Sequence, residues 1–265
     1  MFSLEEITRH SCSGYQDCSP HTILYNILSG SEYLKDKMNR DATALSCHCE
    51  QRRTVCLKHP KATCQVASSV LVKTVCFVRS VPSFNHLPSG DQSSLLRHCW
   101  VSLFVLGLAQ KKIVFEVTEV PNTSILRQIL LGPPGLTGNE ADLPTLAGVH
   151  SLRACLHMLW NLDLSPVEYA YLKWGLLFNP AVQGLSASLF VEHVQQKAQR
   201  ALQDVIHILH PEDAARFSHV LLAASIIQTV SHSLVTELFF KPLIGNTNML
   251  HLLTEMLLTE KPCDS

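Results

Sequence analysis

The chain has 265 residues, of which 46% are apolar and 16% are charged, and its formal net charge is −1. This length suits one large domain with a full hydrophobic core, and the near-neutral charge argues against a strongly basic face for nucleic acid. No uninterrupted run of 18 apolar residues occurs, so no membrane span is expected. The first ten residues contain Glu5 and Glu6 and no apolar run, so no signal peptide is expected there.

The N-terminal part of the chain predicts a short capped helix after a polar tail. Residues 1–18 are mixed in polarity and are expected to be disordered. Ser19 and Pro20 have the arrangement of an N-cap followed by proline at the first helical position, and Gly30 ends the segment. Its aliphatic residues form an L-x-x-I-L motif with all three members on one helical face: Leu24, Ile27 and Leu28. Such a face either packs on its own domain or docks in the groove of a partner.

Residues 31–63 are charged and then rich in cysteine and histidine, which predicts a flexible loop. The possible zinc ligands in and near this loop are Cys47, Cys49, Cys56 and His59. Their spacing is irregular and matches no common zinc module, so a loop without metal is favoured over a zinc site.

The stretch 70–110 predicts two apolar helices joined by a proline-bearing connection. Apolar residues cover more than half the circumference of the first helix, which runs to Val81, as is typical of a helix buried between two layers. Pro82 and Pro88 bracket a link in which neither helix can continue. A buried helix pair therefore forms the centre of the predicted domain.

The second helix of this pair is expected to begin at Ser89, because Ser89 and Gln92 have the S-x-x-Q spacing of a capping box. The whole stretch resembles the signature of the nuclear-receptor ligand-binding domain. The resemblance is carried by V-R-S-V-P-S-F (78–84), Asp91–Gln92, L-L-R (95–97), Trp100 and L-G-L-A-Q (106–110). It implies an all-α fold, a three-layer antiparallel helical sandwich with one short strand or hairpin.

After the helix pair, Lys111–Thr118 is β-branched and alternates weakly in polarity, which predicts a short strand or hairpin. A short segment between Ser124 and Gly132 follows. It repeats the L-x-x-I-L motif with Leu126, Ile129 and Leu130. The motif thus occurs twice, each time on a short, capped, predicted helix. Both interpretations stay open for each copy: docking in the groove of a partner, or packing in the core of its own domain.

The C-terminal half predicts further helices over 145–162, 165–179, 186–209, 211–240 and 249–258. Ser165 and Glu168 form a capping box, with proline at the first helical position. The segment 211–240 is expected to be one long helix. The segment 249–258 resembles the activation-function helix of the receptor family.

The resemblance also implies a cofactor groove with charged residues at its two ends. In the family, such a charge clamp meets the free N–H and C=O groups at the ends of a docked L-x-x-L-L helix. The matching positions here are Val72, Val75, Arg79, Ser93, Arg97, Leu252, Leu253 and Glu255. Ser93 departs from the bulky aliphatic residue that is common at this position.

Taken together, the resemblance implies a receptor-like domain over residues 19–260 that lacks a DNA-binding module, since no C-x-x-C pair occurs. It implies a transcriptional corepressor, in the nucleus and also the cytoplasm, that binds other nuclear receptors through its L-x-x-I-L helices, competes with coactivators and recruits corepressor proteins. A ligand-regulated receptor with an open lipid pocket is the alternative, and it depends on whether Trp100 and Phe104 fill that space. No cofactor is implied, and the lack of nucleotide-binding, zinc-protease and hydrolase motifs argues against an enzyme.

Overall fold

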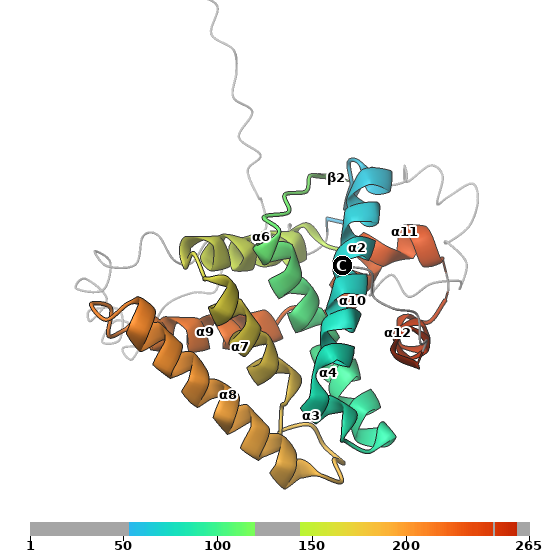
Figure 1. Ribbon diagram of the computed structural model, residues 1–265. Coiled ribbons are helices and arrows are strands. Elements are labelled where there is room, and N and C mark those ends of the chain that lie inside the picture. The colour runs from blue at the N-terminus through green and yellow to red at the C-terminus, as the bar shows by residue number, and fades with distance from the viewer. Residues whose placement is uncertain (1–52, 120–143, 246, 259–265) are drawn as a thin grey trace, which may run out of the picture. The chain divides into compact units, whose positions relative to one another are not determined.

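The computed structural model describes residues 53–119, 144–245 and 247–258, all within one compact unit, Ser46–Ser265 (Figure 1). Helices make up most of it, which confirms the predicted all-α class. In chain order the elements are β1 (Val55–Leu57), α2 (Pro60–Ser80), α3 (Pro82–Asn85), α4 (Ser89–Gln110), β2 (Val117–Glu119), α6 (Leu146–Asn161), α7 (Pro166–Leu177), α8 (Ser188–Leu209), α9 (Arg216–Gln228), α10 (His232–Val235), the π-helix η4 (Thr236–Phe240), α11 (Lys241–Ile244) and α12 (Met249–Leu258).

The helix α4 lies in the middle of this unit and contacts α2, α6, α7 and α9. From Cys99 to Phe104 every residue of α4 is buried, so no side of the helix at this level faces water. A helix that is apolar all round needs neighbours on every side, which is why layers form on both sides of α4. The predicted central helix pair is therefore confirmed.

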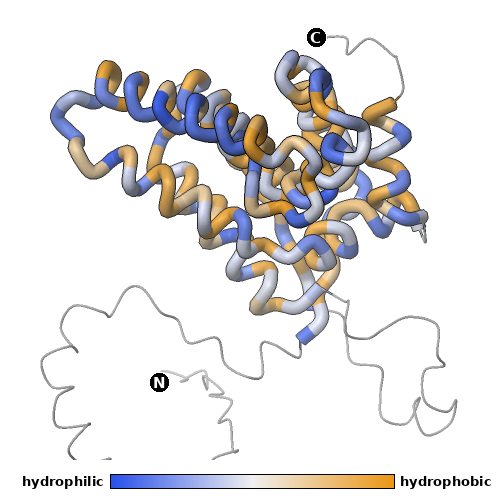
Figure 2. The backbone as a smooth tube through the Cα atoms, turned by 90° about the horizontal axis from the view of Figure 1, so that it is seen from below, coloured by the Kyte–Doolittle hydropathy of each residue, from blue (hydrophilic) through white to orange (hydrophobic). Residues whose placement is uncertain are grey.

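The outer helices bury only one stripe each. Along α8 the buried residues recur every three or four positions: Val191, Val194, Ala198, Leu202 and Ile206. This is the spacing of an amphipathic helix, and Figure 2 shows apolar and polar residues alternating from turn to turn along the helices. The buried stripe of α8 faces α7 and α9.

The helix α2 begins at Pro60, earlier than the expected start near Val70, because proline suits the first helical position. Immediately before it, β1 pairs antiparallel with β2, with Val55 opposite Glu119. The last part of the predicted flexible loop is thus structured, while residues 31–52 lie outside the described residues. The expected strand at 111–118 is present, shifted to its C-terminal end.

Two parts of the described chain have the length and hydropathy of a membrane span: α2, and α9 taken together with the bent segment His232–Ile244. The buried face of α2 contacts α4, η4 and α12. Its apolar character is therefore explained by its place in the core of a helical domain.

The predicted capping box at the start of α4 is wrong. Pro88 occupies the N-cap, and Ser89 is already the first helical residue, so its hydroxyl caps nothing. Gln92 instead reaches back across the link, and its side-chain amide donates to the Leu87 carbonyl (2.9 Å) and the Asn85 carbonyl (3.4 Å). Gln92 therefore fixes the turn between α3 and α4.

The neighbouring Asp91 joins two distant parts of the chain. It is 3% exposed, and its carboxylate accepts from the backbone N–H groups of Ser186 (2.9 Å) and Ala187 (2.8 Å), just before α8. A buried carboxylate needs such partners, and here they attach the start of α8 to the start of α4.

The expected single helix over 211–240 is broken, and its two parts differ in direction by 76°. Side chains at the break satisfy backbone groups that a continuous helix would have used. The Thr229 hydroxyl donates to the Ile226 carbonyl (2.8 Å), and the Ser231 hydroxyl accepts from the Leu234 N–H (3.4 Å). Ser231 thereby caps α10, and α10 continues into the π-helix η4.

An aromatic cluster fills the interior between α4 and η4. Trp100 and Phe104 of α4 are buried with Phe239 and Phe240 of η4. Edge-to-face contacts link them, with ring centroids 6.1 Å apart for Trp100–Phe240, 5.2 Å for Phe104–Phe240 and 5.6 Å for Phe104–Phe239. Phe115 extends the cluster at 5.1 Å from Phe239. These bulky side chains occupy the space that an open pocket beside α4 would require.

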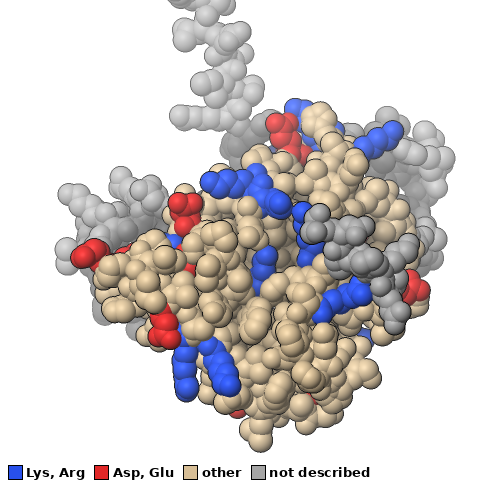
Figure 3. Space-filling view, viewed as in Figure 1, with Lys and Arg blue, Asp and Glu red and all other residues tan. Residues whose placement is uncertain are grey.

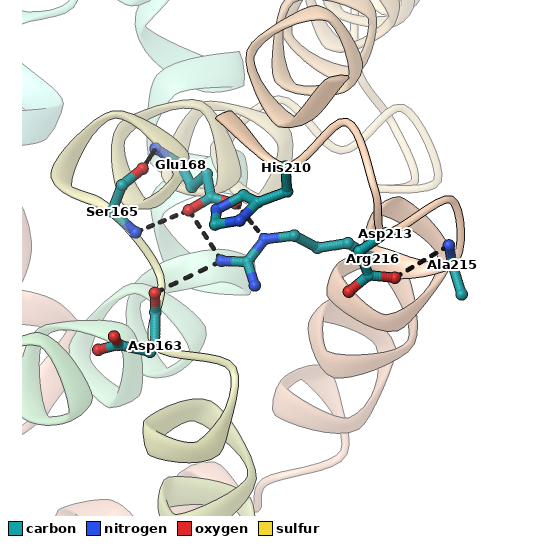
Figure 4. Close-up of polar contacts among 7 residues, drawn as sticks. All are labelled: Asp163, Ser165, Glu168, His210, Asp213, Ala215 and Arg216. Carbon is teal, nitrogen blue, oxygen red and sulfur yellow. Dashed lines mark hydrogen bonds and ion pairs between the residues drawn. The ribbon is translucent and has the colours of Figure 1, made fainter. Parts of the chain in front are cut away.

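The start of α7 contains the predicted capping box and, with it, a buried ion pair (Figure 4). Ser165 and Glu168 each bond the other's backbone N–H group, as the sequence indicates. Glu168 is fully buried. Arg216, at the start of α9, donates two hydrogen bonds to its carboxylate, from Nε to Oε1 (2.8 Å) and from Nη2 to Oε2 (3.1 Å). Arg216 also donates to the Asp163 carbonyl (3.4 Å). The pair therefore joins the starts of α7 and α9.

Gly107 marks the closest approach of α4 to α2. A Cβ at this position would lie 2.6 Å from Cγ1 of Val70. We expect Gly107→Ala to lower the free energy of unfolding by about 1–3 kcal/mol, because the two helices or the Val70 side chain must shift. Urea unfolding followed by circular dichroism measures the change. Gly175→Ala is the matched control, since a Cβ on Gly175 has no atom within 4 Å; equal losses in both variants would contradict the close-approach explanation.

Candidate cofactor-docking site

Both L-x-x-I-L motifs lie outside the described residues. This applies to Leu24, Ile27 and Leu28 and to Leu126, Ile129 and Leu130. Their roles remain predictions from the sequence. The predicted groove and charge clamp, in contrast, lie on α2, α4 and α12, all of which the structure describes.

The α2 side of the groove combines one exposed apolar residue with a basic last turn. Val72 is 48% exposed, which is unusual for a valine of a central helix, while Val75 is 2% exposed and packs into the core. Arg79 follows in the last turn of α2 and is half-buried. Val72, Val75 and Arg79 are spaced by three and four residues, so they lie along one side of the helix.

The α4 side is polar at its surface. Ser93 is half-buried in the first turns of the helix, and Arg97 is exposed one turn later. Positions i and i+4 lie on one face, so Ser93 and Arg97 share one side of α4. The small Ser93 leaves room that a bulky aliphatic residue would fill.

The third wall is α12, which packs on α2. Asn248 begins it, since its side-chain oxygen accepts from the Leu250 N–H (2.8 Å). Leu253 is buried, Leu252 is half-buried against the core, and Glu255 is exposed. The Glu255 carboxylate lies 3.5 Å from the His251 ring one turn earlier. The structure therefore brings together the two helices that carry Arg79 and Glu255.

The zinc candidates do not gather into a site within the described residues. Cys56 is exposed on β1 and His59 precedes α2, while Cys47 and Cys49 lie outside the described part. No group of three or more His, Cys, Asp or Glu side chains that could hold a metal occurs in residues 53–119, 144–245 and 247–258.

Sequence reasoning missed the residues that position this surface. Asn248 begins α12, and Gln92 and Asp91 hold the first turns of α4, where Ser93 and Arg97 lie. The Asp–Gln pair was visible as part of the signature, but the Asp91 carboxylate bonds the backbone of Ser186 and Ala187, which the sequence does not place nearby.

A family model described as the ligand-binding domain of nuclear hormone receptor matches residues 57–128 and 148–244. The chain belongs to this family. The matched residues include the whole of α2 and of α4, the elements on which two sides of the candidate groove are built. Nuclear receptors are ligand-regulated transcription factors rather than enzymes.

Within the nuclear receptors, relatives of one subfamily match nearly the whole chain. Nuclear receptor subfamily 0 group B member 2 is 44% identical in Rattus norvegicus, over 93% of this chain and 95% of the relative. The Homo sapiens protein of the same name is 43% identical, over 94% and 96%. Group B member 1 of Macaca mulatta is 34% identical over 78% of this chain, which spans about half of that longer protein.

A solved nuclear-receptor structure supports the fold. The ultraspiracle ligand-binding domain from Drosophila melanogaster superposes with a TM-score of 0.55 at 22% identity, covering 82% of this chain and 93% of that one. The predicted helical sandwich of the ligand-binding domain type, with one small antiparallel sheet, is confirmed.

Proposed function

We propose that this chain represses transcription by placing its L-x-x-I-L segments in the coactivator grooves of other nuclear receptors. Its full-length similarity to subfamily 0 group B member 2 carries this proposal. Members of group B are atypical nuclear receptors that act as corepressors of other nuclear receptors. The corepressor function is therefore the one to which the similarity assigns this chain.

The docking step is a helix-in-groove interaction. Each motif presents three aliphatic side chains on one face, and burying them is worth about 5–8 kcal/mol before association and ordering costs. Micromolar affinity corresponds to about −8 kcal/mol, so the contacts of the helix ends and backbone with the groove must supply what the three aliphatic side chains do not. Such an affinity is enough to compete with coactivators that dock in the same way.

The chain's own groove is proposed to receive corepressor proteins. Val72 and Leu252 offer the apolar surface, and Val75 and Leu253 support it from the core. Arg79 and Arg97 are proposed to meet the carbonyl end of a docked helix, and Glu255 its N–H end.

Arg79→Ala should weaken binding of a groove-docking cofactor helix, because one of the groups that meets its free carbonyl ends is lost. A helix-end charge contributes about 0.3–1 kcal/mol, so the expected loss is roughly two- to fivefold in Kd. Isothermal titration of the chain with a corepressor peptide measures it. Arg200→Ala, an exposed arginine on α8, is the control, and an Arg79→Ala variant that binds like the control would count against this clamp.

The alternative, a receptor regulated through an open lipid pocket, has no support in the space between α4 and η4. Trp100 and Phe104 are buried and packed against Phe239 and Phe240, so they fill the space beside α4. Membership of the family implies action in the nucleus. We also propose that part of the protein is in the cytoplasm and binds receptors there before they enter the nucleus.

A competition experiment tests the proposed function. A labelled coactivator peptide with an L-x-x-L-L motif is bound to the ligand-binding domain of a second nuclear receptor, and the purified full chain is titrated in. We expect the peptide to be displaced and its fluorescence anisotropy to fall. A panel of receptor domains that all keep the peptide at saturating chain concentration would contradict the proposal. Peptides spanning residues 19–30 and 122–132 show which motif binds each receptor.

A further inference from the structure

The short link between α2 and α4 follows directly on the turn of α2 that carries Arg79. Pro82 and Pro88 restrict its backbone on both sides of α3. Three of its apolar side chains are buried in the core: Val81, Phe84 and Leu87. The backbone of the link is therefore held in one conformation, and polar side chains that it carries have fixed starting points.

Two side-chain amides connect the ends of α2 and α4 across this link. Asn85 donates from Nδ2 to the Arg79 carbonyl oxygen (2.9 Å), in the last turn of α2. Gln92 donates from Nε2 to the Asn85 carbonyl oxygen (3.4 Å) and to the Leu87 carbonyl oxygen (2.9 Å). A chain of hydrogen bonds thus runs from Gln92 in the first turn of α4, through Asn85, to Arg79.

The Arg79 carbonyl needs a partner from outside its helix. It is one of the last four carbonyl groups of α2, and these have no N–H partner within the helix. Helix ends without capping partners fray, so the Asn85 amide stabilises the last turn. Because Arg79 is the penultimate residue of α2, fraying of this turn would also move its guanidinium relative to the groove.

The Arg79 end of α2 lies on a face of the molecule that is rich in positive charge. Figure 3, in the view of Figure 1, shows Lys and Arg side chains over the middle of the face that contains α2 and α3. Asp and Glu side chains lie mostly towards the outline of this face. A docked helix that ends here in a carboxylate would therefore meet positive charge, and the position of the last turn of α2 decides how closely it meets Arg79.

We propose that Asn85 is a positioning residue of the cofactor groove. Its side-chain amide fixes the last turn of α2, so that the Arg79 guanidinium is already in place when the carbonyl end of a helix docks. Preorganisation of this kind strengthens binding because less freedom is lost on association. The inference rests on the proposed use of the groove, and it adds a residue that is not among the eight predicted groove positions.

Two synthetic peptides test the inference. Each has one L-x-x-L-L motif, and they differ only in whether the chain ends after the motif in a free carboxylate or in an amide. Isothermal titration of the full chain gives both Kd values at one salt concentration. The carboxylate peptide should bind the wild type about threefold more tightly, because its extra charge lies at the helix end that Arg79 meets.

The ratio of the two Kd values reports the charge contact and not the general stability of the groove. We expect Asn85→Ala to lower this ratio to the value found for Arg79→Ala. The Arg79→Ala, Asn85→Ala double variant should show no further change, because Asn85 acts through Arg79. Asn85 is exposed, so Asn85→Ala should stay folded, which circular dichroism checks.

Gln195→Ala is the matched control. The Gln195 side chain also donates from its amide to a helix carbonyl, that of Gly175 (3.2 Å), but it lies on α8, which carries none of the groove residues. This variant should keep the wild-type ratio.

Two results would overturn the inference and leave the groove itself intact. One is a wild-type ratio in folded Asn85→Ala. The other is a further loss in the double variant, which would show that Asn85 acts independently of Arg79. A wild type that binds neither peptide would overturn the groove and the inference together, whereas displacement of a coactivator peptide from a second receptor tests the L-x-x-I-L docking separately.

Discussion

Arg216→Ala should destabilise the domain by about 3–5 kcal/mol, the range expected when one partner of a buried ion pair is removed. The remaining Glu168 carboxylate is fully buried and would keep its Ser165 backbone bond and the His210 ring, whose Nε2 lies 3.9 Å from Oε1. The contact between α7 and α9 would lose its polar link as well. Urea unfolding of the purified chain, followed by circular dichroism, measures the loss.

Two comparisons separate this effect from a general loss of arginine. Arg200→Ala, at an exposed position of α8, should change stability by less than about 0.5 kcal/mol. A Glu168→Leu, Arg216→Met double variant should recover much of the loss, because it leaves no buried charge without a partner. Equal stability of Arg216→Ala and Arg200→Ala would show that the pair is unimportant for folding.

The same pair predicts how stability depends on pH. Burial alone would raise the pKa of Glu168, but the bonds from Arg216 and Ser165 hold it below its ordinary value of 4.5. A lowered folded-state pKa means that the stabilisation is present above the unfolded pKa and is lost as the pH falls through the folded pKa. The free energy of unfolding should therefore fall below about pH 4.5 more steeply in the wild type than in Glu168→Gln. Parallel curves for the two proteins would contradict this assignment.

Local signals in the sequence predicted much of the fold. The Ser165 capping box, the helix starting after Thr145 and the apolar α4 all depend on residues within a few positions of one another, and each is confirmed. Ser89 shows the limit of such signals. Its spacing to Gln92 fits a capping box. Pro88, however, is the extended residue before the helix, so the N-cap lies one position earlier than expected and no side chain caps the helix.

The features that the sequence did not predict involve partners far apart in the chain. Glu168 and Arg216 are separated by 48 positions and Asp91 and Ala187 by 96, and nothing local marks either pair. The break between α9 and α10 was missed because an apolar periodicity continues through it, while Thr229 and Ser231 end the helix by side-chain bonds. For the groove, the resemblance predicted which residues line it but not how exposed each one is. In the structure Val72 is exposed and can contact a partner, whereas Val75 is buried.

Leu126→Ala combined with Leu130→Ala should weaken binding to a partner nuclear receptor by about 3 kcal/mol, roughly 100-fold in Kd. Both leucines lie on the apolar face of the second L-x-x-I-L motif, and each should be buried in the receptor groove on docking. Leu24→Ala with Leu28→Ala applies the same test to the first motif. If either double variant is unfolded by circular dichroism, that motif is a core helix.

The matched control changes the two residues inside the second motif that helical spacing would place off its apolar face, Arg127→Ala with Gln128→Ala. The decisive measurement is the Kd of the full chain for the ligand-binding domain of a second nuclear receptor, for the wild type, the control and the Leu126, Leu130 variant. We expect a folded leucine variant that binds about 100-fold more weakly, while the control binds like the wild type. A folded leucine variant that binds as tightly as the wild type would contradict it.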